Sequence, residues 1–169
     1  MTSENQRSAD NQQAKQVGWI VGFVDGEGTF SVSIIKNSTT SSGWQIFPEF
    51  VITQGEKSVD ALKNIQKFFK CGKLYLNTRY DNHKENLYRY CVRSLQDLEK
   101  NIVPFFLANP LRTAKKDDFH KFVRVLAIIK QKKHLTPKGM RKIALIIQTM
   151  NRKKPSRYLL ASETTRLDR

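Results

Sequence analysis

One short segment of this chain has the residue types and spacing that metal-dependent chemistry requires. Asp25-Gly26-Glu27-Gly28 places two carboxylates among glycines, directly after the apolar residues 17–24. Glycine lets the backbone turn sharply and lets another molecule approach closely. A carboxylate in such a turn can hold a divalent cation, and the cation can in turn contact phosphate oxygens. The tetrapeptide alone is also typical of a helix end followed by a turn, so both interpretations stay open at this point.

Two other kinds of metal site are poorly supported. An EF-hand loop starting at Asp25 would have Phe30 instead of Gly at its sixth position and Lys36 instead of Glu at its twelfth. The two cysteines, Cys71 and Cys91, and the three scattered histidines lack the spacing of a zinc site. So few cysteines favour a reducing, intracellular compartment over a disulfide-stabilised protein.

The net charge points to a polyanionic partner. Lys and Arg number 30 against 15 Asp and Glu, which gives a net charge of +15. A surface this basic usually binds nucleic acid or an anionic membrane. Residues 85–169 carry most of the excess, with 20 basic against 7 acidic residues. Such charge runs are also typical of solvated helix surfaces, but an excess of fifteen over one domain favours a phosphate backbone.

The sequence gives no membrane or targeting signal. Its longest apolar run, residues 17–24, is too short to cross a bilayer. Residues 1–13 contain acids and no hydrophobic stretch, unlike a secretory signal, and are not Arg-rich, unlike an organelle transit peptide. We therefore expect no membrane partner.

The elements that position the Asp25-Gly26-Glu27-Gly28 turn follow from hydrophobic periodicity. They are a buried helix over 17–24, strands over 29–36 and 45–53, a helix over 58–69, strands over 73–80 and 87–93, and helices over 94–106, 111–130 and 136–150. Ser58 and Ser94 are expected to cap the helices that they begin. This order, αββαββα with extra C-terminal helices, predicts an α+β fold with an antiparallel sheet. Residues 1–14 are polar and predict a disordered tail, 15–160 a single domain, and 161–169 a C-terminal tail.

With its neighbours included, the segment Ile20-Val21-Gly22-Phe23-Val24-Asp25-Gly26-Glu27-Gly28 resembles the signature of the LAGLIDADG homing endonucleases. The stretch Pro110-Leu111-Arg112-Thr113-Ala114-Lys115-Lys116-Asp117-Asp118-Phe119 resembles the family's later PL-x-T-x-K-x-x-D-F segment, and residues 134–151 are similar to its C-terminal helices. The three motifs occur in the family's order, and the resemblance covers roughly residues 16–160. It implies that the four strands form a DNA-binding saddle.

The resemblance also implies roles for individual residues. The metal-binding carboxylate falls on Glu27, with the Gly26 carbonyl beside it and Mg²⁺ as the expected cofactor, Mn²⁺ being the alternative. Gln54, at the end of the second strand, is expected to order water near the metal, with Lys57 as a basic residue shortly after it. Lys115 falls on the lysine of the catalytic pocket. Plain solvation is the alternative for Gln54, Lys57 and Lys115.

Strand alternation separates the face expected to read DNA from the face that forms the core. Phe30, Val32 and Ile34 are expected to face the core, so the alternate residues of each strand face outward. Polar side chains there can pair with base edges in a groove. The residues expected to contact DNA are Ser31, Ser33, Ile35, Asn37, Gln45, Glu49, Val51, Tyr75, Asn77, Arg79, Arg89 and Arg93.

A single copy of the motif implies a dimer. The family cuts both DNA strands with one acid per strand, and no second copy of the motif occurs after residue 28. Helix 17–24 has no polar face, and two glycines four residues apart leave one side flat for close packing. We expect a two-fold interface formed by Gly18, Trp19, Val21 and Gly22. The alternative is a helix buried inside its own monomer.

The resemblance therefore implies a homodimeric, Mg²⁺-dependent, site-specific endonuclease that makes a staggered double-strand break in a long, near-palindromic DNA target. It also implies an intron-encoded protein of a chloroplast or mitochondrion. One alternative is an intron RNA-splicing maturase, or a cleavage-deficient nucleic-acid-binding protein of the same fold. A third possibility is a basic nucleic-acid-binding module without sequence preference. Glu27 favours the nuclease, because a pure binder gains nothing from an acid that faces phosphates.

Overall fold

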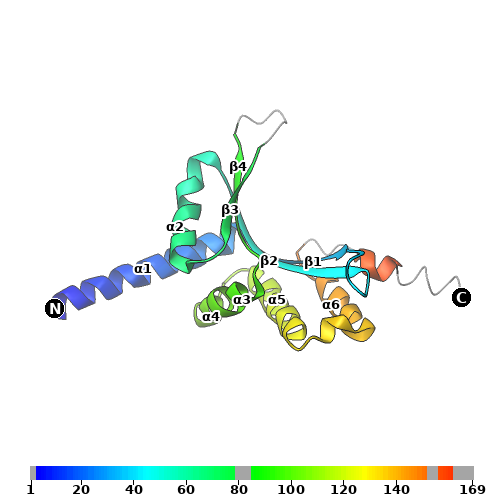
Figure 1. Ribbon diagram of the computed structural model, residues 1–169. Helices are drawn as coiled ribbons and strands as arrows, with labels where there is room; N and C mark the ends of the chain where they lie inside the picture. The colour runs from blue at the N-terminus through cyan, green and yellow to red at the C-terminus, as the bar shows by residue number, and fades with distance from the viewer. Residues whose placement is uncertain (1–2, 79–84, 152–155, 162–169) are drawn as a thin grey trace, which may run out of the picture.

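The fold is built around one strongly bent, four-stranded antiparallel sheet (Figure 1). The computed structural model describes residues 3–78, 85–151 and 156–161. The strands are β1 (Gly28–Lys36), β2 (Trp44–Gly55), β3 (Lys73–Asn77) and β4 (Leu87–Val92). Their order across the sheet is β1-β2-β4-β3, so the two hairpins meet where β2 pairs with β4. The predicted α+β fold with four antiparallel strands is confirmed.

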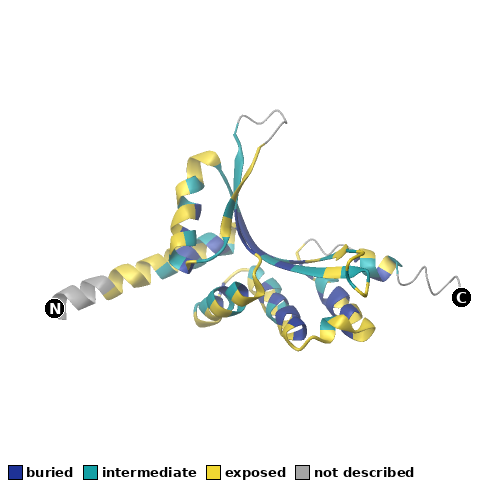
Figure 2. Ribbon diagram, viewed as in Figure 1, coloured by how far each residue is buried: buried dark blue, intermediate teal, exposed yellow. Residues whose placement is uncertain are grey.

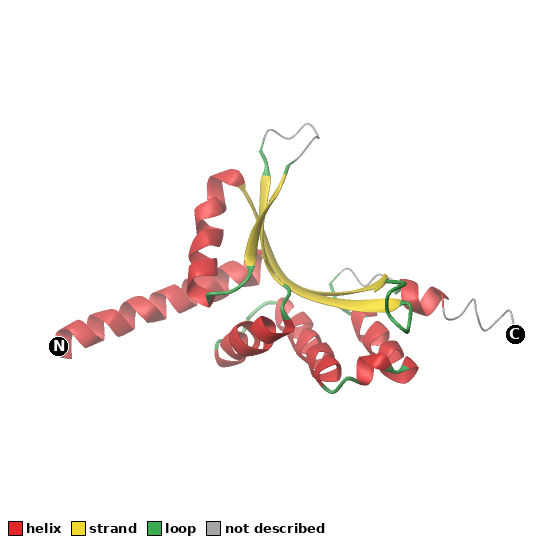
Figure 3. Ribbon diagram, in the orientation of Figure 1, coloured by secondary structure: helices red, strands yellow, loops and turns green. Residues whose placement is uncertain are grey.

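Helices α4, α5 and α6 lie along one face of the sheet, α2 lies beside the β3–β4 hairpin, and α1 projects away from the body (Figure 1, Figure 3). The helices are α1 (Ser3–Glu27), α2 (Val59–Phe69), α3 (Leu95–Asp97), α4 (Val103–Ala108), α5 (Lys115–Lys130) and α6 (Pro137–Gln148), with the helical turns η1 (Glu56–Ser58), η2 (Leu98–Ile102) and η3 (Lys133–Leu135). Among the helices in the described ranges, none is both long enough and apolar enough to span a membrane.

Local sequence signals explain where several helices begin. The Ser94 hydroxyl accepts a hydrogen bond at 3.3 Å from the third backbone N–H after it, as predicted for a cap. Thr136 caps α6 in the same way, accepting from the N–H of Gly139 at 3.1 Å. The predicted cap at Ser58 is wrong, because its side chain makes no capping bond. The tight turn η1 leads directly into α2 there.

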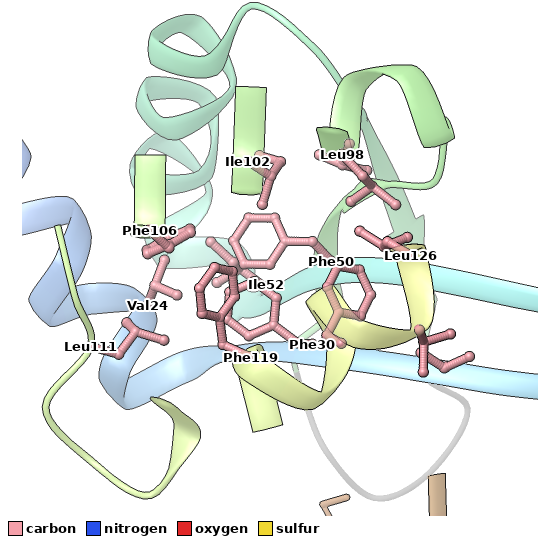
Figure 4. Close-up of a cluster of buried hydrophobic side chains, with 14 of the residues drawn as sticks. Val24, Phe30, Phe50, Ile52, Leu98, Ile102, Phe106, Leu111, Phe119 and Leu126 are labelled. Atoms are coloured by element: carbon pink, nitrogen blue, oxygen red, sulfur yellow. The ribbon is translucent and has the colours of Figure 1, made fainter. Parts of the chain in front are cut away.

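The hydrophobic core lies between the inner face of the sheet and the helices packed on it (Figure 4). Phe30 is fully buried on β1, and its ring centroid lies 5.0 Å from those of both Phe50 and Phe119. Phe106 of α4 meets Phe30 edge to face at 5.5 Å. Aromatic pairs in these arrangements add to the free energy gained by burial. Buried residues gather where the sheet bends and on the helix sides that face it, which leaves the other sheet face open (Figure 2).

The ends of the chain differ from the prediction. The sequence predicts a disordered tail over residues 1–14, but α1 begins at Ser3. The polar stretch before residue 17 contains neither Gly nor Pro. Once the buried turn from Ile20 to Val24 has formed a helix, each further residue extends it at little cost. Of the predicted C-terminal tail only Ala161 lies within the described residues, and the domain limits at 15 and 160 stay predictions.

Several internal boundaries also differ. The helix predicted over 17–24 continues to Glu27, so Asp25, Gly26 and Glu27 lie in its last helical turn. The strand predicted over 73–80 ends at Asn77. The helix predicted over 94–106 is divided into α3, η2 and α4 and reaches Ala108. The helix predicted from residue 111 begins only at Lys115. The reason for the late start is that the backbone N–H groups of Arg112 and Thr113 bond to the side chain of Asp25.

Candidate active site and nucleic-acid interface

Asp25 joins the end of α1 to a segment far along the chain. Its carboxylate accepts hydrogen bonds from the backbone N–H of Arg112 at 2.7 Å and from the hydroxyl of Thr113 at 2.6 Å. Burial by itself raises the pKa of this carboxyl, but the bonds from Thr113 and Arg112 outweigh that effect. The pKa of Asp25 is therefore lowered from its ordinary value of 3.8. Asp25 is engaged in a structural contact.

Lys115 closes the C-terminal end of the same helix. Its Nζ donates to the carbonyl oxygen of Val24 at 2.9 Å and to that of Gly26 at 3.1 Å. A cation at this end suits the negative pole of the helix dipole. Burial lowers the pKa of Lys115, while the charges of Asp25 and Glu27 act to raise it. The structure thus brings Lys115 to the last helical turn of α1, which ends at Glu27.

Glu27 is the last residue of α1, and its side chain is exposed. Its carboxylate makes no hydrogen bond or ion pair within the described part of the chain. The next residue has to be glycine, because a Cβ on Gly28 would lie 2.6 Å from Cγ1 of Val24 and 2.9 Å from its carbonyl oxygen. The tight junction of α1 and β1 therefore leaves Glu27 as the free carboxylate of the pair, with Asp25 as the engaged one.

Gln54 and Lys57 lie at and beyond the end of β2. The register pairs the first residue of β1 with Ile52, so Gln54 lies two residues further along, beside the end of α1. Gln54 is half-buried, whereas Lys57 is exposed in η1 and its backbone N–H donates to Glu85 at 2.7 Å. Neither side chain hydrogen-bonds to Glu27 in the ranges that the structure describes. Their catalytic roles therefore stay predictions.

The residues around this turn fit a hard divalent cation in part. A free carboxylate and a neighbouring carbonyl oxygen, from Glu27 and Gly26, are the oxygen ligands that Mg²⁺ prefers. Among the described residues, no group of three or more His, Cys, Asp and Glu side chains could hold a metal ion. The Gly26 carbonyl also accepts a hydrogen bond from Lys115. A cation bound at Glu27 would therefore need further oxygens from outside this chain, such as DNA phosphates or a second copy.

The register places the outward strand face where alternation predicts it. The inner face carries core residues such as Phe30, Phe50 and Tyr90, and their alternate neighbours face away from the helices. The predicted DNA contacts on this outward face are Ser31, Ser33, Ile35, Gln45, Glu49, Tyr75, Asn77 and Arg89, with Arg93 directly after β4. Asn37 follows β1, and its side chain donates to that of Gln45 at 2.8 Å. The remaining predicted contact, Arg79, lies outside the described residues.

Val51 is wrong as a predicted DNA contact. Strand alternation places Val51 on the same face as Glu49, yet its exposed fraction is only 5%. Its register partners are Thr29 on β1 and Cys91 on β4, so neighbours on both sides cover this position of the central strand. Phe47, which is not among the predicted contacts, lies half-buried on the same outward face. Strand alternation, which selected the apolar residues Ile35 and Val51, gives Phe47 the same outward position and was the signal that could have found it.

One side of α1 has no partner in the described chain. Ile20 and Val24 are fully buried, whereas Trp19 is 42% exposed and both Gly18 and Gly22 are exposed. A Cβ added at either glycine would meet nothing within 4 Å. A groove of about 810 Å³ follows this side, between α1 and the segment after α4. Burial of the whole helix inside its own monomer is therefore wrong.

Comparisons with known proteins agree with this architecture. The family model described as LAGLIDADG endonuclease matches residues 20–126. "Probable intron-encoded endonuclease 2" of Neurospora crassa is 34% identical over 125 residues, which cover 74% of this chain and 25% of that protein. "DNA endonuclease I-CeuI" of Chlamydomonas moewusii is 27% identical over 88 residues, or 52% of this chain and 38% of that protein. The chain spans about a quarter of the length of the first curated relatives that it matches.

Solved structures of similar chains have the same fold. The homing endonuclease I-TnaI is 35% identical with a TM-score of 0.74, and the match covers 90% of this chain and 97% of that one. The LAGLIDADG meganuclease I-CpaMI, bound to uncleaved DNA, is 31% identical with a TM-score of 0.79, over 89% of this chain and 49% of that one. On the family match across more than half of its residues, this chain belongs to the LAGLIDADG endonuclease family.

Proposed function

We propose that this chain is a site-specific DNA endonuclease that works as a homodimer and needs a divalent metal ion, with Glu27 as its catalytic acid. The proposal depends on the different surroundings of the two carboxylates at the end of α1. Asp25 is engaged by Arg112 and Thr113, while Glu27 is exposed beside the Lys115 ammonium. A metal-dependent nuclease needs a free carboxylate to hold its cation, whereas a protein that only binds DNA does not.

Each residue at the turn has a proposed part in cleavage. A divalent cation, when bound, supplies Lewis-acid activation of the phosphate and of a water nucleophile. Glu27 and the Gly26 carbonyl would hold that cation. Lys115 would offset negative charge that develops on the phosphate, because its Nζ already lies 3.1 Å from the Gly26 oxygen. Gln54 would orient water, and Lys57 would contribute further positive charge.

Mg²⁺ is the proposed ion, with Mn²⁺ as a substitute, because the available ligands are hard oxygens. One relative, I-SmaMI, has been solved bound to its uncleaved DNA target in the presence of calcium ions, which supports a divalent cation at this kind of site.

Two features of this chain support the proposed homodimer: the number of free acids and the open side of α1. One chain offers one free Glu27, and a double-strand break needs one such acid per strand. The exposed residues Gly18, Trp19 and Gly22 of α1 would pack on the same side of a second copy. Val21 is half-buried against the core but also lines the groove, so it would contribute to the same interface. The match to I-CpaMI covers 49% of that chain, so one copy of this chain corresponds to about half of that protein. Two-fold symmetry predicts a near-palindromic target with two half-sites.

The names of the relatives bear on where the gene lies. Several are called intron-encoded, among them those of Neurospora crassa and Mycosarcoma maydis. We propose that this gene also lies in an intron, in a mitochondrial or chloroplast genome, and that the break is staggered.

The test is cleavage of a plasmid library in Mg²⁺ by the wild type and by Glu27→Gln. Discrete double-strand cuts are expected from the wild type. The variant is expected to lose cleavage and to bind DNA as tightly or more tightly, because it loses a metal ligand and also a charge that repels phosphates. Glu99→Gln is the matched control, since Glu99 pairs with Lys130 at 3.2 Å on the helical side. Cutting by Glu27→Gln at the wild-type rate would contradict the assignment, and nucleic-acid binding without any cut by the wild type would favour the splicing or cleavage-deficient alternative.

A further inference from the structure

Glu49 lies on the outward face of the central strand β2 and contacts two arginines of the neighbouring strand region. Its Oε2 accepts a hydrogen bond from Nε of Arg93 at 3.0 Å, and its Oε1 lies 3.6 Å from Nη2 of Arg89. The Glu49 side chain is 17% exposed, against 37% for each arginine. A carboxylate at the centre of the surface proposed to bind DNA would repel phosphates, so its presence there needs an explanation.

Two aromatic rings hold the same guanidinium. The Arg93 Cζ lies 5.3 Å from the ring centroid of Phe47 and 5.1 Å from that of Tyr75. Phe47 comes from β2 and Tyr75 from β3, on either side of β4, so three strands fix the position of one side chain. Cation–π contacts of this kind restrict the plane of the guanidinium as well as its place. Arg93 therefore loses much of its rotamer freedom before any ligand arrives.

The contact with Glu49 leaves the two Nη groups of the Arg93 guanidinium free to bind a ligand. Its hydrogen bond engages Nε, and within the described chain the two Nη groups of Arg93 have no hydrogen-bond partner. Such a planar pair of donors matches the O6 and N7 acceptors of guanine in the major groove. Arg89 is held less firmly, because its contact with Glu49 is longer, at 3.6 Å, and no ring stacks on it among the described residues.

We infer that Arg93 reads a guanine in each half-site and that Glu49 is the positioning residue that makes this reading selective. This inference rests on the proposed function. Glu49 acts in two ways: it holds Arg93 in place, and its charge opposes movement of the guanidinium to a nearby phosphate. Arg89, which is held less firmly, contacts the phosphate backbone.

The inference makes a distinctive prediction for Glu49→Gln. The amide keeps the size of the side chain but lacks the charge that holds Arg93. Binding to random DNA should become several-fold tighter, because a negative charge leaves the DNA surface. Discrimination at one base pair per half-site should fall at the same time. If Glu49 had a merely structural role, the substitution would change the affinity for the selected site and the affinity for random DNA equally.

The experiment is a binding selection from a library of randomised targets with Ca²⁺ as the ion, followed by affinity measurements on the selected site and on random DNA. Arg93→Lys keeps the positive charge but removes the planar pair of Nη donors. The preference of this variant for guanine should fall about tenfold or more at one position per half-site. Glu49→Gln should lose preference at that same position. Arg89→Ala should weaken binding to all sequences alike, and Glu99→Gln should leave the base profile unchanged.

The outcomes separate this inference from the proposed function. If the wild type selects no site and makes no cut, the proposed function fails. If the wild type is specific but Arg93→Lys and Glu49→Gln keep its base profile, or relax two different positions, the inference alone is overturned. Thermal melting of each variant checks that it is folded.

Discussion

Asp25 and Glu27 are two residues apart, yet the structure gives them opposite surroundings. Asp25 accepts bonds from Arg112 and Thr113 at 2.6–2.7 Å, while Glu27 is exposed. Asp25→Ala should therefore lower the free energy of unfolding by about 1–3 kcal/mol, because it leaves the partner N–H groups without an acceptor. Glu27→Ala should leave it unchanged within about 0.5 kcal/mol. Urea unfolding of both variants measures this, and an Asp25→Ala variant as stable as the wild type would refute the anchoring role.

The same contact has a pH dependence with a defined sign. The pKa of Asp25 is lowered from 3.8 in the folded state, so its stabilising effect is fully present above 3.8. The effect is lost as the pH falls below 3.8 toward the folded-state pKa. The difference in urea midpoint between the wild type and Asp25→Ala should therefore shrink over that acidic range. A difference that stays constant would show that the carboxylate charge is not what the contact uses.

Lys115 combines a structural contact with a proposed catalytic one. Lys115→Met should reduce cleavage by about 10²–10³-fold, as expected when one charge-stabilising donor is removed from a reacting centre. DNA binding should change far less, because one phosphate contact contributes little to the total. Lys116→Met is the matched control, since Lys116 is exposed on the same turn of α5. Single-turnover cleavage of the selected target gives both rates, and equal losses in the two variants would remove Lys115 from the mechanism.

At the scale of the element, the open side of α1 can be tested without disturbing the monomer. An alanine Cβ at Gly18 or Gly22 meets nothing within 4 Å in one chain, and alanine favours a helix by about 0.5–1 kcal/mol over glycine. Gly22→Ala should therefore keep or raise the melting temperature of the monomer. In a dimer packed on this side the extra methyl group would be overpacked, which costs about 1–3 kcal/mol. That cost would weaken association by about five- to 150-fold.

Sedimentation velocity across a concentration series measures that association. Gln16→Ala is the control, because Gln16 is exposed on α1 but does not line the groove. A wild-type protein that stays monomeric on DNA and still makes double-strand breaks in one encounter would contradict the dimer.

At the scale of the whole molecule, the charge of +15 predicts a steep dependence of DNA binding on salt. If a dimer neutralises about ten phosphates, the logarithm of the association constant should fall against the logarithm of salt concentration with a slope of about −9. Between about 50 and 200 mM salt the affinity should change enough for fluorescence anisotropy to measure this slope. A slope shallower than about −3 would mean that the basic surface does not meet the DNA.

Much of this molecule is determined by the sequence itself, because alternation and turn chemistry depend only on neighbouring residues. A period of two decides the face of each strand residue, so Ser31 and Arg93 could be placed on the outward face without any knowledge of the sheet. Glycine at position 28 marks the sharp turn after Glu27 for the same local reason. The motif order likewise identified the family.

Only the tertiary structure decided which of these residues are engaged. Asp25 and Arg112 are 87 positions apart, and Glu49 and Arg93 are 44 apart, so no local pattern contains either contact. Val51 has the parity of a DNA contact and is buried, because burial in a central strand depends on the neighbours on both sides. Periodicity fixes the direction in which a side chain points, whereas its partners are set by the packing of segments that are distant in sequence.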